Sequence, residues 1–455
     1  MSSHGVAGAT LRLMGAAALS LAALLPADAR AAHQLRESPT DRRIFDVGSR
    51  LEVKGQVETS VGEGKSTAHT LHVTAAFRYR ERRMSGTGRD AETLRSLRDY
   101  NDAEARIEVG GEFTSSRLRD NRRSIVARGQ RAGVTFYSPA GPLTYGELEL
   151  LRTPGDSLAA LPLLPPKAVD VGETWKTDSW VIQTLTSTDA VVKSDLTCRL
   201  ESAEGGVAKV TFAGSLEGAT AGASTNVEIT GHYLFDLAEG YWKHLEVRQK
   251  EKRSVGAVTP GLSVEATAVV ERAASQTEGT LSDAAIARIP LEPSEAVMML
   301  DFRSPWNVRF THDRDWHIFH QSDRVAILRL LDKGSLIAQC NVTQIPSSQP
   351  GKRTSEEQFQ RDISTALGDK LKAIEKAEEL TTDDDRYLYR VTTSGEANGL
   401  PMKWIYYLCA DAAGRQIALV FAIEEKLVDQ LANRDLGIVN SVEFLTPITP
   451  TNGRK

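Results

Sequence analysis

The sequence predicts a sheet-rich α+β protein. We expect an N-terminal antiparallel β domain, forming a curved sheet or partial barrel, followed by an antiparallel sheet with helices packed on it. Apolar and polar residues alternate with a period of two over much of residues 45–280, as in strands with one buried and one solvated face. Turn signals such as Glu204-Gly205-Gly206 separate these segments. After about residue 305, strands alternate with amphipathic helical segments, which indicates a second domain.

Residues 1–31 have the layout of a secretory signal peptide. Arg12 precedes the apolar stretch Leu13–Leu25, and Ala29-Arg30-Ala31 provides an A-x-A cleavage site before Ala32. A second site of this type, Ala27-Asp28-Ala29, leaves two candidate positions for the cut. The apolar stretch is too short to span ~30 Å of hydrocarbon. We therefore expect a secreted or periplasmic protein with no transmembrane segment after the signal is removed.

Composition agrees with a globular protein of two or three domains. The 455 residues are 41% hydrophobic and 25% charged, with a formal net charge of -5. Loss of Arg12, Asp28 and Arg30 would remove a net charge of +1 and leave -6. A mildly acidic chain gives no general attraction to nucleic acid.

The N-terminal domain, residues 32–285, is predicted to consist mainly of strands. Residues 73–79 show the alternation most clearly, and the further candidates are Ala105–Val109, Ser124–Ala127, Val134–Tyr137, Trp175–Leu185, Asp195–Glu201, Val207–Leu216, Ser224–Asp236, Tyr241–Glu251 and Leu262–Arg272. One helix is expected after Thr144, which with Glu147 makes a capping box before Leu148. The proline-rich segment Leu161–Pro166 is predicted to be extended. It would fill the core beside that helix, or line a ligand-binding face.

A linker is predicted at residues 286–303, where Pro290 and Pro293 interrupt regular structure. The C-terminal domain follows at residues 304–446, with a tail at 447–455. Its expected elements are a hairpin around Asp332-Lys333-Gly334, a helix capped by Thr354 with apolar residues recurring as far as Ile374, three strands (Arg386–Thr392, Met402–Cys409 and Gln416–Ile423), and a final helical stretch from Leu427 to Val439.

This C-terminal third resembles the PsbP-like fold, named for an extrinsic subunit of photosystem II. The resemblance rests on Trp316-His317-Ile318, the hairpin with the long helix, and the closing segment Ile438–Phe444. It implies an antiparallel sheet with helices, and a role in binding or assembly without a shared catalytic residue. The first domain resembles a family of uncharacterised exported bacterial proteins. That resemblance rests on the Leu143–Leu151 helix and the run from Leu163 to Trp175, and it implies no activity.

Four groups of residues are candidates for chemical sites. Gly64-Lys65-Ser66 is similar to the end of a phosphate-binding loop but lacks the preceding glycine, so we expect a hairpin turn. The other groups are the metal-ligand types His312, Asp313, Asp315, His317 and His320, the acidic run Asp383-Asp384-Asp385, and a basic stripe made of Arg78, Arg80, Arg82, Arg83, Arg117, Arg119, Arg122 and Arg123. We expect the histidine and aspartate group to form a polar loop, the acidic run a solvated turn, and the basic stripe a solvated sheet face. We assign no catalytic, cofactor-binding or metal-binding residue, and no cofactor.

The leading functional hypothesis is a non-enzymatic exported protein that binds a partner protein or an apolar, lipid-like ligand. The alternatives are an extracellular hydrolase with unrecognised acid and base residues, or a structural component of the cell envelope. The three cysteines can form at most one bridge within the chain. If a bridge exists, we expect it between Cys340 and Cys409, which both lie on predicted C-terminal strands; otherwise each is a buried thiol.

Overall fold

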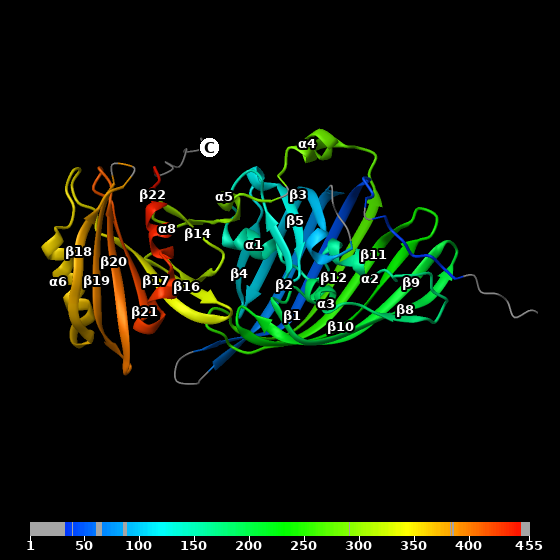
Figure 1. Ribbon diagram of the computed structural model, residues 1–455, viewed down its shortest axis with the longest axis horizontal. Coiled ribbons are helices and arrows are strands. Elements are labelled where there is room, and N and C mark those ends of the chain that lie inside the picture. The colour runs from blue at the N-terminus through cyan, green and yellow to red at the C-terminus, as the bar shows by residue number, and fades with distance from the viewer. Residues whose placement is uncertain are drawn as a thin grey trace, which may run out of the picture.

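A computed structural model of the chain describes residues 32–38, 40–60, 66–84, 89–290, 292–382, 384 and 386–446. The predicted signal peptide and the tail lie outside the described residues. Within the described part, the strands form antiparallel sheets of 12, 3 and 7 strands, and helices pack on the two large sheets (Figure 1). The predicted sheet-rich α+β class is therefore confirmed.

The 12-stranded sheet occupies the N-terminal half and is open at both edges. Its strand order is β6-β5-β3-β2-β1-β12-β11-β10-β9-β8-β7, with β4 paired to the second half of β3. The strands are β1 (Ile44–Ser60), β2 (Ser66–Arg83), β3 (Arg95–Val109), β4 (Glu112–Arg117), β5 (Ser124–Gln130), β6 (Gly133–Tyr137), β7 (Thr174–Lys176), β8 (Ala190–Glu204), β9 (Val207–Thr220), β10 (Ala223–Asp236), β11 (Tyr241–Arg253) and β12 (Gly261–Ala274). The sheet curves around its short helices, as Figure 1 shows.

The inner face of this sheet is filled by its own chain. Helices α1 (Tyr145–Leu151), α2 (Ala160–Leu163) and α3 (Ser179–Thr186) pack there with the inward side chains of the strands in one apolar core. The predicted capping box is confirmed, because Thr144 accepts from the Glu147 N–H and Glu147 accepts from the Thr144 N–H. Leu161, Leu163 and Leu164 belong to this core beside Leu148. The proline-rich segment therefore has the core-filling role.

Buried ion pairs lie at one end of the same inner face. Arg98 on β3 donates to Glu81 at 2.9 Å and to both carboxylate oxygens of Asp156 at 2.8 Å. Burial acts to raise the pKa of Glu81, but the charge of Arg98 and a hydrogen bond from Ser157 lower it below its ordinary value. A second buried pair joins Arg272 to Glu37 at 2.5 Å. These pairs balance charges that would otherwise be costly in the core.

Two N-terminal expectations were wrong in detail. Trp175–Leu185 is not one strand, because only Thr174–Lys176 pairs with β8 and the rest forms α3. The apolar residues of α3 face the inner core. They would be buried in a strand as well, so the spacing of apolar residues does not distinguish a helix from a strand here. Leu161–Pro166 is not extended throughout. Pro162 lies in the single helical turn of α2, at a position where a missing N–H breaks no helical hydrogen bond.

Between the large sheets, residues 275–299 hold α4 (Asp283–Ala287) and α5 (Glu295–Met298). A small sheet follows, with order β13-β14-β22, made of β13 (Leu300–Arg303), β14 (Val308–His312) and β22 (Glu443–Phe444). Asp301 on β13 is fully buried and pairs with Arg309 at 2.5 Å and with Arg119 of the N-terminal half at 3.1 Å. The predicted linker thus contains α5 and β13, and its last strand contacts both halves.

The 7-stranded sheet has order β15-β16-β17-β21-β20-β19-β18. Its elements are β15 (Trp316–Gln321), β16 (Val325–Asp332), β17 (Ser335–Ile345), α6 (Glu356–Leu367), β18 (Leu371–Leu380), β19 (Tyr387–Ala397), β20 (Leu400–Ala410) and β21 (Gln416–Glu424), followed by α7 (Val428–Leu431) and α8 (Arg434–Asn440). One face packs against α6, and the other against α7, α8 and β14. The predicted hairpin between β16 and β17 is confirmed, with Lys333 and Gly334 at positive φ in the turn.

The predicted long helix was wrong at both ends. Its cap is Ser355 rather than Thr354, since the Ser355 side chain accepts from the Gln358 N–H. The helix ends at Leu367, where Gly368 takes a φ of 50°, which favours glycine after a helix. Residues 371–380 then form strand β18, although Leu371 and Ile374 continue the helical spacing. Four strands, instead of three, therefore lie between this helix and α7.

Candidate functional site

The outer face of the 12-stranded sheet carries the candidate site, a hollow of about 1190 Å³. It extends over β4, β3, β2, β1 and β12, on the side opposite the helices. The outward side chains that line it are Arg50, Glu52, Thr74, Ala76, Glu104, Arg106, Phe113, Ser115, Arg117, Thr267 and Val269. A hollow of this size exceeds a typical small-molecule pocket.

Strand register explains why the surface is hollowed there. One cross-strand row runs from Arg50 through Ala76 and Glu104 to Arg117. The next row runs from Glu52 through Thr74 and Arg106 to Ser115. In both rows a small residue on β2 lies between long residues on β1 and β3. Side chains opposite one another stand about 5 Å apart, so the long side chains flank the small ones directly. Ala76 and Thr74 therefore form the floor, and the long side chains form the walls.

The walls carry cations and an aromatic ring. Within the described residues, Arg50, Arg106 and Arg117 form no salt bridge. The guanidinium carbon of Arg106 lies 4.5 Å from the ring centre of Phe113, a cation–π contact. The Phe113 side chain is 57% exposed. The walls also hold two acids, of which Glu52 is paired with Lys54 at 2.5 Å. The hollow thus combines an exposed aromatic surface with three arginines that have no acidic partner among the described residues.

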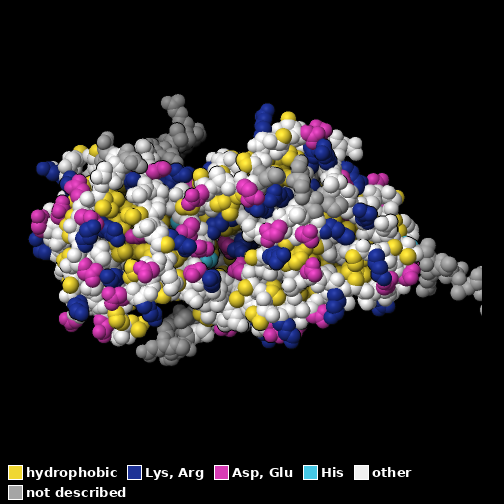
Figure 2. All heavy atoms as spheres, viewed as in Figure 1, with side chains coloured by type: hydrophobic (Ala, Val, Ile, Leu, Met, Phe, Trp, Pro, Cys, Tyr) yellow, Lys and Arg dark blue, Asp and Glu magenta, His cyan; other side chains and the backbone are white. Residues whose placement is uncertain are grey.

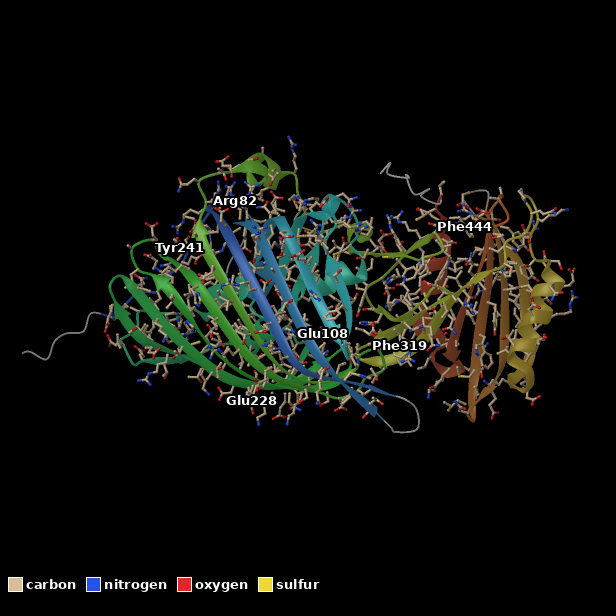
Figure 3. The ribbon with its side chains drawn as sticks, turned by 180° about the vertical axis from the view of Figure 1, so that it is seen from behind. Arg82, Glu108, Glu228, Tyr241, Phe319 and Phe444 are labelled. Atoms are coloured by element: carbon tan, nitrogen blue, oxygen red, sulfur yellow. The ribbon has the colours of Figure 1, made fainter. Side chains whose placement is uncertain are left out.

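A second hollow of about 780 Å³ adjoins the first on the same face. The two meet at β1 and β12, where Glu52 and Thr267 line the first and Lys54 and Glu265 the second. Its charges alternate in sign, and Lys250 pairs with Glu265 at 3.0 Å. Figure 3 labels Glu228 of this second hollow at the lower edge of the sheet. The second hollow thus carries charges of both signs, some of which pair with each other.

Most of the predicted basic stripe is neutralised by acidic partners. The pairs are Arg78 with Asp102, Arg80 with Asp99, Arg82 with Asp283, Arg83 with Glu37, Arg119 with Glu147 and Asp301, and Arg123 with Asp120. Arg122 instead donates to the Pro142 carbonyl. On the face shown in Figure 2, positive and negative side chains are interspersed over both halves. Only Arg117 of the stripe lines the hollow, together with Arg50 and Arg106, which sequence analysis did not identify.

The structure does not gather the histidines near residue 315 into a metal site. His312 is fully buried, its Nδ1 lies 2.7 Å from the Asp313 carbonyl, and burial lowers its pKa to about 4. His317 is half-buried with its ring 6.1 Å from that of Tyr145, and His320 is exposed. Asp313 and Asp315 both lie near Arg434, at 3.7 and 3.1 Å. Of these side chains, His317 contacts the N-terminal half through Tyr145, whereas Asp313 and Asp315 pair with Arg434 within the C-terminal half.

The two remaining sequence motifs lie partly outside the described residues, namely Gly64 and Lys65 of one and Asp383 and Asp385 of the other. Strands β1 and β2 pair up to Ser60 and Ser66, the last residue of the first motif, as expected for a hairpin. Asp384 accepts from Arg386 at 2.6 Å beside β19, which is consistent with a solvated turn.

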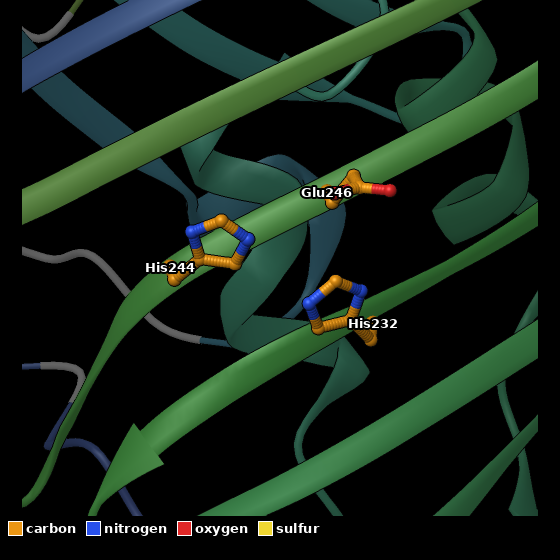
Figure 4. Close-up of side chains that lie close together, drawn as sticks. All are labelled: His232, His244 and Glu246. Carbon is orange, nitrogen blue, oxygen red and sulfur yellow. The ribbon is translucent and has the colours of Figure 1, made fainter.

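Three other side chains on the outer face could hold a metal ion. They are His232 on β10 and His244 and Glu246 on β11, whose candidate ligand atoms all lie within 4.8 Å of one another (Figure 4). Sequence analysis missed this group, although it predicted both strands. Pairing those strands across their short turn would have placed the two histidines close together.

Comparisons with known proteins give no family. No protein-family model matches the chain, and no curated protein matches it. Among solved structures, one similar chain is lipovitellin, from a structure concerned with its lipid–protein interactions. The TM-score is 0.30 and the identity 10%, over 53% of this chain and 27% of that chain. This protein therefore spans about a quarter of the length of lipovitellin.

A second similar structure is a cyanobacterial PsbP from Synechocystis. Here the TM-score is 0.26 and the identity 14%, over 34% of this chain and 99% of that chain. At these TM-scores neither likeness establishes a shared fold. Among the helices of the described residues, none is both long and apolar enough to cross a bilayer.

Proposed function

We propose that this protein is a binding protein, and that the larger outer hollow holds an elongated amphiphile with an apolar chain and an acid group. The observation that carries the proposal is the meeting of three arginines, unpaired within the described part of the chain, with an exposed aromatic ring over a floor of small side chains. Arginine binds carboxylate and phosphate oxygens through paired N–H groups. Phe113, Ala76 and Val269 offer apolar surface to a hydrocarbon chain.

The hollow suits binding better than acid–base catalysis. Side-chain hydrogen bonds from Lys54 and His72 lower the pKa of Glu52. A hydrolase with a general acid would need a carboxyl group whose pKa is raised towards the working pH. A lowered pKa keeps Glu52 ionised, so Glu52 does not suit the part of a general acid. We favour the binding role because of the three arginines and the exposed ring.

The test uses a dansylated long-chain fatty acid as the probe and the corresponding fatty alcohol as its neutral analogue. Wild-type protein should bind the acid saturably and more tightly than the alcohol. Arg106→Gln and Arg117→Gln should each weaken binding of the acid by about tenfold or more, the effect of losing one charge-assisted hydrogen bond. The same substitutions should change binding of the alcohol much less.

Arg199→Gln is the matched control, because Arg199 is an exposed outward arginine of the same sheet, on β8, away from the hollow. It should bind the acid as wild type does. Equal affinity for the acid in wild type, Arg106→Gln and Arg117→Gln would contradict the proposal. A similar loss in Arg199→Gln would show that the general charge of the sheet, rather than this hollow, attracts the probe.

We further propose that the protein is exported, which is supported by the sequence Arg12, Leu13–Leu25 and Ala29-Arg30-Ala31. N-terminal sequencing of protein from the original host should begin near Ala32. Recovery of intact Met1 from a periplasmic or extracellular fraction would contradict export.

The division into two domains, and a PsbP-like fold for the second, also remain proposals. They are supported by separate apolar clusters in the two large sheets and by the hairpin, helix and strand order of the C-terminal third. Limited proteolysis should cut between about residues 280 and 305, because boundaries fall in exposed linkers. A stable C-terminal fragment is expected, and cutting there without one would mean that the halves fold together.

A further inference from the structure

We infer that His232, His244 and Glu246 form a binding site for a divalent transition-metal ion of the zinc class on the outer face of the sheet. Figure 4 shows both imidazole rings and the carboxylate on the same side of β10 and β11. The candidate ligand atoms lie within 4.8 Å of one another, and all three residues are half-buried. This inference is independent of the ligand proposed for the hollow.

The backbone brings these ligands together. His232 lies directly opposite Glu246 in the β10–β11 ladder, and His244 precedes Glu246 by two residues on the same face. The ladder shifts register between Leu234 and Phe235, beside His244. Such bulges redirect side chains at the ends of strands. The two imidazole rings consequently lie with their centres 5.1 Å apart.

A neighbouring carboxylate orients one of the ligands. Nδ1 of His244 lies 2.8 Å from Oε1 of Glu271 on β12, which is opposite His244 in the ladder. When Nδ1 donates its proton to Glu271, the lone pair of Nε2 is left free for a metal. This carboxylate–histidine arrangement is the usual support of histidine ligands to zinc. It separates this group from a chance pair of surface histidines.

The donor set determines the class of ion. Two imidazoles and one carboxylate suit zinc and its neighbours, and leave a fourth position for water or another ligand. Ligand atoms around tetrahedral zinc stand ~3.3 Å apart, so small side-chain rotations would close the site. Glu246 also accepts from Arg248 at 2.7 Å. When a metal binds, either this ion pair breaks or the Glu246 carboxylate contacts both Arg248 and the metal. Calcium and magnesium, which prefer oxygen ligands, should bind poorly.

The test uses the mature protein without a polyhistidine tag, treated with a chelator and then titrated with Zn²⁺ by calorimetry. We expect one equivalent of Zn²⁺ to bind, and Co²⁺ to give the visible absorption bands of a tetrahedral site. His232→Asn and His244→Gln should each weaken Zn²⁺ binding by on the order of 100-fold. Glu271→Gln should weaken it by about 10- to 100-fold, as measured for other residues that orient a metal ligand.

His72→Asn is the matched control, because His72 also lies on the outer face with its Nε2 3.4 Å from Glu52 but has no second imidazole beside it. It should bind Zn²⁺ as wild type does. Zn²⁺ should also raise the melting temperature of wild type and His72→Asn, but not of His232→Asn or His244→Gln. Failure of wild-type protein to bind Zn²⁺, or equal binding by folded His232→Asn and His244→Gln, would overturn the inference.

Discussion

The two large sheets differ in what covers their faces. The 12-stranded sheet packs one face on α1, α2 and α3, and no helix of the described residues covers the other, whereas the 7-stranded sheet has helices against both faces. The strands carry this difference in their sequences. In β10 buried and exposed residues alternate over much of its length, while Trp404–Ala410 of β20 are buried without interruption. A bare face can evolve hollows and metal ligands, and a covered face is constrained by packing.

The comparison is tested most strongly by placing one charge on each kind of face. Ala418 on β21 lies beneath α6, and Ala76 on β2 forms the floor of the outer hollow. Ala418→Asp should lower the free energy of unfolding by about 3–5 kcal/mol, because the carboxylate would be buried without a partner. Ala76→Asp should change it by no more than about 0.5 kcal/mol, as for other surface substitutions. Urea unfolding followed by circular dichroism gives both values.

The same pair of variants separates stability from binding. Ala76→Asp should weaken binding of the dansylated fatty acid, since it adds negative charge to the floor of the hollow. If instead Ala76→Asp destabilised the protein as much as Ala418→Asp does, the outer face of the N-terminal sheet would not be bare. The contrast between the two sheets would then be wrong.

Below pH ~4, loss of carboxylate charge should weaken the N-terminal half more than strands β20 and β21 of the C-terminal sheet. Buried His312 on β14, whose pKa burial lowers to about 4, removes stability from the small sheet already as the pH falls below the ordinary histidine value. Glu81, Glu147 and Asp301 lie in the N-terminal half or in the strand that joins it to the rest. In each, burial acts to raise the pKa, but arginine partners and hydrogen bonds lower it below the ordinary value. A carboxyl group with a lowered pKa contributes stability that is fully present above its unfolded pKa and is lost as the pH falls through its folded pKa. Below pH ~4 we therefore expect a loss on the order of 1–3 kcal/mol.

Hydrogen exchange followed by mass spectrometry locates this loss. Between neutral pH and pH ~3, after correction for the intrinsic exchange rate, protection should fall in β2, β3 and α1 while β20 and β21 keep theirs. An Arg98→Met variant should lose stability at neutral pH, because it leaves Glu81 and Asp156 without their partner. Simultaneous loss of protection in both sheets on acidification would mean that the two cores unfold as one unit.

Sequence patterns predicted the bare sheet better than its site. Alternation identified most strands of the N-terminal half, and Thr144 with Glu147 identified the start of α1. Periodicity failed to distinguish a strand from a helix where both structures would bury the same residues. Val181, Ile182 and Leu185 suit a strand as well as they suit α3, and Leu371 continues the spacing of α6 although it begins β18.

The hollow depends on information that no single strand contains. Ala76 becomes a floor only because register sets it between Arg50 and Glu104, and register between distant strands cannot be read from local periodicity. The histidine group was within reach, since its strands are joined by a short turn. The local density of possible ligands that drew attention to His312, His317 and His320 carried no such geometric support.

The smallest effect is expected from the cysteines, for which the structure has buried thiols and no bridge between Cys340 and Cys409. Cys340 lies opposite Phe421 and Cys409 opposite Ile417, so strand β21 separates β17 from β20. Two strand spacings are ~10 Å, beyond the ~7 Å that a disulfide can span between Cα atoms.

All three cysteines are free and buried, and burial raises the pKa of Cys198 and of Cys409 to about 12. Neutral thiols react slowly, so alkylation should label none of them in native protein and all three after denaturation. A reducing agent should leave the melting temperature unchanged in both sheets. A bridge closing the loop between Cys340 and Cys409 would instead contribute about 4 kcal/mol, and its reduction would lower the melting temperature of the C-terminal sheet alone.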